Sequence, residues 1–172
     1  MLFRLFFVSL ILVAAQAYST FTGSCVVGTT VGGTHLISRS KGGLAAYGLT
    51  LNIGGKNVTA STAFSFPKGK SLVIKISGAK SFKGFQMRIG SGTTNTVGYL
   101  TKGVTSNVQV DRICTGIKIG GICHNSKTLK KSAQGIIKVP AAMKGLKLQV
   151  TVVVTNVGVS QWYTSTYTLN AV

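Results

Sequence analysis

The chain has 172 residues, with 19 Lys and Arg side chains against a single acidic residue, Asp111, and a formal net charge of +18. Its length fits one domain, and its 45% content of hydrophobic residues is too high for a disordered chain. Paired catalytic carboxylates, an acid-rich metal site and a Ser-His-Asp triad all need acids that this sequence lacks. We therefore expect a binding protein that is not an enzyme and has no cofactor and no metal.

The first 17 residues have the pattern of a secretory signal peptide. Arg4 precedes an apolar run over 5–15, and the small residues Ala15 and Ala17 predict cleavage after Ala17. A membrane anchor is the competing interpretation, but the apolar run is shorter than the ~20 residues that a membrane span needs. We therefore assign 1–17 to a signal peptide and 18–172 to a single domain, and we expect the mature protein to be secreted.

An extracellular location changes the interpretation of the cysteines and of one sequon. Cys25, Cys114 and Cys123 become disulfide candidates. Because three is an odd number, one thiol either stays free or pairs between two chains, so a disulfide-linked dimer is one possible outcome. The sequon Asn57-Val58-Thr59 makes Asn57 a candidate glycosylation site.

Alternating apolar residues predict strands along most of the mature chain. The irregular segment 28–43, rich in Gly, Thr and Ser, comes first. Strands are predicted over 44–53 and 56–66, and they are joined by Gly54-Gly55, a two-residue loop suited to the positive φ angles of a hairpin turn. A third strand is predicted over 70–76, where apolar residues recur at every second position.

The C-terminal half continues this pattern. Residues 126–134 are compatible with one or two helical turns, which is the only helical signal after residue 17. Apolar residues alternate with mostly polar ones over 146–154, and 161–169 is rich in β-branched and aromatic residues. The sequence therefore predicts an all-β fold, an antiparallel immunoglobulin-like β-sandwich of about seven to nine strands.

The adjacent pair Cys123-His124 raises two chemical hypotheses, a nucleophile with its base and a zinc site. Neighbouring residues on a strand face opposite sides of the sheet, so His124 is poorly placed to activate Cys123. A zinc site would add Cys114 and His35, but the Cys spacing matches no compact zinc motif and a secreted chain favours disulfides. A structural role is therefore the stronger interpretation.

The basic residues lead to a binding hypothesis. Lys127, Lys130 and Lys131 form the densest basic stretch, which is either a solvated loop or part of a broad basic surface that includes Lys83 and Arg88. The positive field attracts acidic polysaccharide, matrix or microbial surfaces, and nucleic acid only non-specifically. The alternative function is a cationic host-defence protein that binds anionic membrane surfaces.

Residues 82–88, FKGFQMR, resemble the central F-x-G-F-x-x-R motif of the reeler (reelin-type) extracellular domain. The resemblance covers roughly 18–169, because further matching residues follow in the same order: Cys114, Cys123-His124-Asn125-Ser126, Pro140, Gly145 and Trp162. It implies an extracellular β-sandwich of the kind found in matrix, adhesion and defence proteins, with no catalytic residues of its own.

Two departures from the family pattern affect what the resemblance implies. Cys123-His124-Asn125-Ser126 stands where the family usually has Thr-His-Ser, and Ile137 stands where an aromatic residue often precedes the proline. Cys25 paired with Cys114 or Cys123 would tie the N-terminus to the sandwich, whereas a Cys114–Cys123 bond would close a short loop. We favour a disulfide that includes Cys25.

Overall fold

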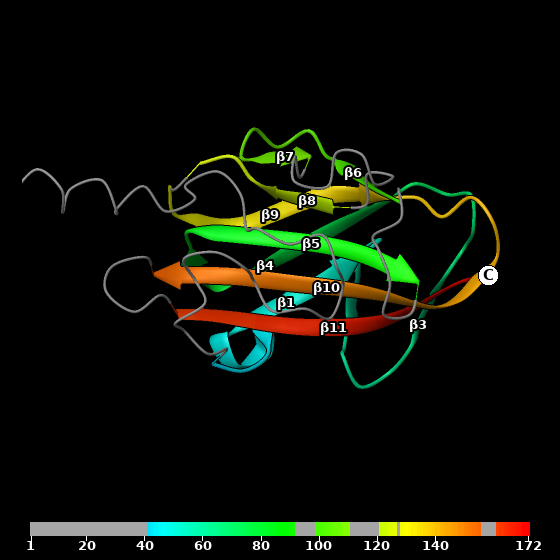
Figure 1. The fold of residues 1–172 in the computed structure, drawn as a ribbon, viewed down its shortest axis with the longest axis horizontal. Coiled ribbons are helices and arrows are strands. Elements are labelled where there is room, and N and C mark those ends of the chain that lie inside the picture. The colour runs from blue at the N-terminus through cyan, green and yellow to red at the C-terminus, as the bar shows by residue number, and fades with distance from the viewer. Residues whose placement is uncertain (1–40, 92–98, 111–120, 127, 156–160) are drawn as a thin grey trace, which may run out of the picture.

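Two β-sheets packed face to face make up the fold (Figure 1). The structure is a computed structural model that describes residues 41–91, 99–110, 121–126, 128–155 and 161–172. Within these residues it contains eleven strands and one short 3-10 helix, η3 (Leu44–Tyr47). The predicted all-β sandwich is confirmed.

The five-stranded sheet has the order β2-β1-β4-β9-β6, and all of its strand pairs are antiparallel. Its strands are β2 (Lys56–Val58), β1 (Leu49–Ile53), β4 (Leu72–Phe82), β9 (Lys130–Ile137) and β6 (Leu100–Lys102). The six-stranded sheet has the order β3-β11-β10-β5-β8-β7, and only β3 and β11 run parallel. Its strands are β3 (Phe64–Phe66), β11 (Gln161–Ala171), β10 (Met143–Thr155), β5 (Gly84–Ser91), β8 (Gly121–His124) and β7 (Val108–Val110).

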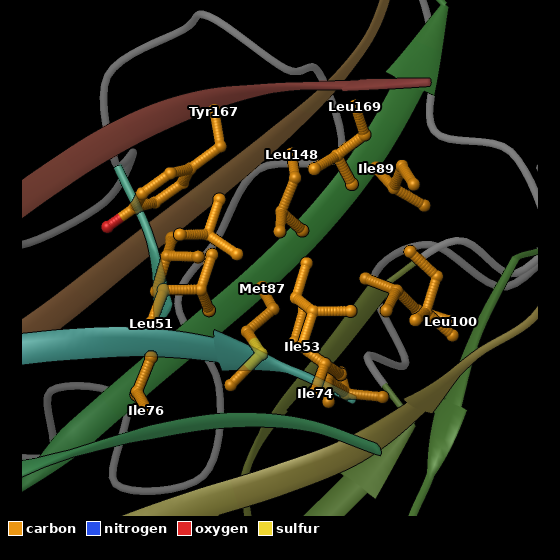
Figure 2. Close-up of a cluster of buried hydrophobic side chains, with 14 of the residues drawn as sticks. Leu51, Ile53, Ile74, Ile76, Met87, Ile89, Leu100, Leu148, Tyr167 and Leu169 are labelled. Carbon is orange, nitrogen blue, oxygen red and sulfur yellow. The ribbon is translucent and has the colours of Figure 1, made fainter. Parts of the chain in front are cut away.

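One hydrophobic core fills the space between the sheets. Alternate residues of each strand point inward, so β1 and β4 face β5, β10 and β11 across it. Figure 2 shows this meeting of side chains, with Leu51, Ile74 and Ile76 from one sheet and Met87 and Leu148 from the other. Burial of these apolar surfaces is the main stabilising contribution in a chain with one acidic side chain.

The Gly54-Gly55 hairpin has the predicted conformation. Both glycines have positive φ, 57° and 88°, and the turn joins β1 to β2 in an antiparallel pair. The Asn52 side chain accepts a hydrogen bond of 2.9 Å from the Gly55 amide and so closes the turn. Both central residues of such a turn need positive φ, which glycine adopts without strain.

Three predicted elements are wrong in detail. Residues 44–47 form η3 rather than a strand, and Gly48 ends this helix with φ at 76°. The predicted strand 56–66 is broken at 59–63, so that β2 and β3 enter different sheets. Residues 130–134, allowed a helical turn, belong to strand β9. Most of the irregular segment predicted over 28–43 lies outside the described residues.

The outward face of β10 also differs from a simple polar surface. Lys147 is half-buried, and the polar side chains of Gln149 and Thr151 are buried. Gln149 is the register partner of Arg88 on β5, which is buried as well. The polar residues of β10 therefore lie on the face of the sheet that points away from the core, but at Gln149 and Thr151 this face is not exposed to solvent.

Candidate functional site

Arg88 does not belong to a binding surface. Its side chain is 0% exposed, and its Nη2 donates a hydrogen bond to Oε1 of Gln149 on the neighbouring strand β10. A guanidinium buried in this way cannot reach a ligand in solvent. The guanidinium instead bonds to Gln149 within the sheet, and the prediction that Arg88 joins the basic surface conflicts with this burial.

Lys130 is also directed inward, and only 4% of the residue is exposed. Its ammonium donates to the carbonyl oxygens of Lys83, Ser126 and Thr128 over 2.8, 2.6 and 2.7 Å. Burial lowers the pKa of Lys130 to about 8, while the three carbonyls favour the charged form, so the group is an ammonium at pH 7. Lys130 therefore ties the β8–β9 connection to the β4–β5 turn and is not a surface ligand.

Two other predicted residues, Lys83 and Lys131, lie at one end of the sandwich, where β5 begins and β10 ends (left in Figure 1). The hydrogen bond from Lys130 brings the turn that contains Lys83 against the start of β9. The four residues 78–81 bulge opposite the single residue Lys131, because Ser77 pairs with Ser132 and Phe82 with Lys130. Lys127 lies outside the described residues.

This arrangement defines a basic end, formed by Lys80, Lys83 and Lys131. Lys80 and Lys131 are exposed and Lys83 is half-buried. Among the described residues there is no acidic side chain, because the only one in the chain, Asp111, lies outside them. The basic end therefore presents positive charge that no carboxylate side chain of the described residues offsets.

A pair of tyrosines that the sequence analysis did not single out borders the basic end. The rings of Tyr47 and Tyr163 stack with centroids 4.8 Å apart, and Lys80 Nζ lies 5.2 Å from the Tyr47 centroid. The Tyr47 hydroxyl donates to the Ser81 carbonyl oxygen over 2.7 Å. Burial, and to a smaller extent Tyr163, raise the pKa of Tyr47, so the hydroxyl keeps its proton at neutral pH. No local pattern joins residues so far apart in the chain.

The Cys123-His124 pair is structural in its surroundings. His124 is buried, and its Nδ1 lies 3.1 Å from both the amide nitrogen and the carbonyl oxygen of Phe85. The Gln109 side-chain amide donates to the Cys123 sulfur over 3.7 Å and to the His124 carbonyl oxygen over 3.1 Å. Within the part of the chain that the structure describes, no three His, Cys, Asp or Glu side chains are grouped to hold a metal ion.

The remaining predicted sites are only partly covered by the described residues. Asn57 is exposed on the edge strand β2, where its Oδ1 accepts a hydrogen bond of 3.3 Å from the Asn52 side chain. Cys123 is buried, and the signal peptide 1–17, Cys25 and Cys114 lie outside the described residues. The disulfide pairing therefore stays a prediction. In the described ranges, no helix is long and apolar enough to cross a membrane.

The residues that carry the FKGFQMR motif have a common structural role. Phe82 and Phe85 are fully buried and meet edge to face with centroids 6.2 Å apart. Gly84 lies against His124, and a Cβ at this position would come within 2.9 Å of the His124 ring. With Gln86, Met87 and Arg88 also buried, the motif specifies the packing of β4, β5 and β8, and Lys83 is its one residue that is not buried.

No protein-family model and no curated protein matches the sequence. Solved structures do match it. Fragment 1 of the human F-spondin reeler domain has 15% identity and a TM-score of 0.55, over 72% of this chain and 88% of its own. Fragment 2 of the same domain has 16% identity and a TM-score of 0.56, over 78% and 93%. The Reelin-N domain of F-spondin has 15% identity and a TM-score of 0.55, over 72% and 86%. The chain therefore has the reeler-domain fold that its FKGFQMR motif implied.

Proposed function

We propose that this protein is a secreted, non-enzymatic module that binds anionic extracellular material, such as an acidic polysaccharide, through its basic end. The observation that carries the proposal is the gathering of Lys80, Lys83 and Lys131 at one end of the sandwich. The proposed extracellular location rests on the signal-peptide pattern of 1–17 and on the fold shared with F-spondin reeler domains.

The chemistry of the basic end suits a sulfated or carboxylated sugar. Ammonium groups form charge-assisted hydrogen bonds with sulfate and carboxylate oxygens. A net charge of +18 adds a long-range field that speeds the approach of a polyanion. Lys130 supports this end from inside, because its ammonium bonds to the carbonyl oxygen of Lys83 and to two carbonyl oxygens of the β8–β9 connection, which leads into β9 and Lys131.

The proposal is tested by measuring heparin affinity at several salt concentrations. The triple variant Lys80→Glu, Lys83→Glu, Lys131→Glu is expected to bind more weakly and to depend less on salt. If each lysine makes one contact, the log–log slope should fall by about 2, at roughly 0.7–0.9 per contact by analogy with nucleic acids.

The matched control reverses three exposed lysines at the opposite end of the sandwich, namely Lys56, Lys68 and Lys144. Both triple variants carry the same net charge, so the comparison isolates position from total charge. An equal fall in slope for the two variants would show that binding follows the diffuse field, and the basic end would then be only a solvated surface.

A second function is supported by one exposed apolar side chain. Leu129 is 66% exposed and lies two residues before Lys131, an arrangement that suits contact with an anionic membrane surface. If the protein binds membranes, Leu129→Ser should reduce sedimentation with phosphatidylglycerol vesicles and leave heparin affinity unchanged. Unchanged sedimentation of Leu129→Ser would remove the support for membrane insertion.

A further inference from the structure

A groove of about 310 Å³ lies on the outer face of the five-stranded sheet, near the edge formed by β6. Val73 on β4 and Ile136 on β9 are register partners and form adjacent parts of its lining. Val104, in the connection after β6, lies across from them. The volume is at the lower end of the roughly 300–1,000 Å³ that is typical of small-molecule sites.

The groove is built by a close approach of the β6–β7 connection to β9. A Cβ on Gly103 would lie 3.3 Å from the Gln134 carbonyl oxygen and 3.4 Å from the Gly135 Cα, so this backbone contact leaves little room for a larger residue. The Thr105 hydroxyl donates to the same carbonyl oxygen over 3.3 Å and anchors the connection. The wall that carries Val104 is therefore held in place by the fold.

The apolar lining faces solvent to an unusual degree. Val104 is 97% exposed and Val73 is 45% exposed, and among the described residues they are two of four exposed large hydrophobic side chains, with Leu129 and Val172. Single exposed apolar residues are ordinary, but Val73 and Val104 border one hollow together with Ile136. An alkyl chain placed there would remove apolar surface from water on both partners.

Positive charge surrounds the same hollow. Lys102 lines it directly. Lys75 follows Val73 by two residues on β4, so strand alternation places it on the same outer face. Lys138 is exposed directly after the end of β9, two residues beyond Ile136. The described residues offer no carboxylate side chain to pair with these ammonium groups. An apolar floor with a cationic rim is complementary to an anionic amphiphile.

We propose that this groove binds the alkyl chain of a single fatty acid, whose carboxylate pairs with Lys102. The alkyl chain packs against Val73, Val104 and Ile136. The groove lies toward the opposite end of β4 and β9 from the basic end, so this site is separate from the proposed polyanion surface. Either site can be present without the other.

The test is calorimetric titration of the full mature protein with decanoate, with decanol as the uncharged probe of equal chain length. We expect saturable 1:1 binding of decanoate and weaker binding of decanol. Val73→Trp, which fills the groove, should lower decanoate affinity by about tenfold or more, since burial of alkyl carbons supplies most of the binding. Val104→Ser, in an exposed connection, provides a second variant that does not disturb a strand.

Two controls match these variants. Val172→Trp changes a valine that is also exposed, at the C-terminus, and should leave decanoate affinity unchanged. Lys102→Gln should weaken decanoate but not decanol, whereas Lys56→Gln, at the other edge of the sheet, should affect neither. Absence of saturable binding, or equal affinity in the Val73→Trp, Val104→Ser and unaltered proteins, would overturn the proposal. Equal affinity for decanoate and decanol would overturn the role of Lys102.

Discussion

Replacing Val150 or Val152 with Asp is expected to leave the protein unfolded or insoluble. Both side chains are fully buried in the core, on the strand β10 that lies between β11 and β5. An unpaired buried charge costs several kcal/mol, and a domain of this size has a total stability of only about 5–15 kcal/mol. Circular dichroism of the purified protein, together with its soluble yield, measures the effect.

Lys147→Asp is the matched control on the same strand. Lys147 faces the other side of the sheet, and the side-chain bond that it loses, from Nζ to the Thr168 hydroxyl over 2.8 Å, contributes about 1 kcal/mol. This variant should fold. If Val150→Asp and Lys147→Asp were tolerated equally, the assignment of the two faces of β10 would be wrong.

Lys130→Met is expected to destabilise the protein by about 2–4 kcal/mol although it keeps the aliphatic part of the side chain. The change leaves the carbonyl oxygens of Lys83, Ser126 and Thr128 without their ammonium donor. An unsatisfied buried acceptor costs about 1–3 kcal/mol, and because these bonds are part-buried, water offsets some of the loss and the total stays well below three full costs. Urea unfolding followed by circular dichroism gives the free energy of unfolding.

Lys131→Met serves as the control, because Lys131 is adjacent and exposed. Substitution at such a surface position usually changes the free energy of unfolding by less than about 0.5 kcal/mol. If Lys130→Met changed the free energy of unfolding as little as Lys131→Met, the three hydrogen bonds from the Lys130 ammonium would make no contribution to stability, and the structural role assigned to Lys130 would be wrong.

The long strands were predictable from the sequence because every second side chain of a strand faces the core, so apolar residues recur at every second position. Residues 146–154 and 161–169 lie within β10 and β11, and the Gly54-Gly55 turn has the expected positive φ angles. The three-residue strands β2, β3, β6 and β7 are too short to show a period. They raise the strand number to eleven in the described residues, above the seven to nine expected.

The candidate site was less predictable, because exposure of a basic residue depends on its three-dimensional surroundings. Lys130 and Lys131 are neighbours in the chain, yet Lys130 is buried and bonds to three carbonyl oxygens, whereas Lys131 is exposed. Arg88 follows the buried core residue Met87 and faces away from the core, but it is covered all the same. Contacts such as Tyr47 with Tyr163 depend on the assembled sheets, so no sequence spacing reveals them.

Binding of a polyanion at the basic end can be mapped by titrating the protein with a heparin hexasaccharide and recording amide NMR spectra. We expect the largest chemical-shift changes at 79–83, which include most of the β4 bulge, and at 129–132, around the start of β9. Amides near Lys56, Lys68 and Lys144, at the other end of the sandwich, should change little. Changes of equal size at both ends would show that the hexasaccharide has no preferred site at the basic end.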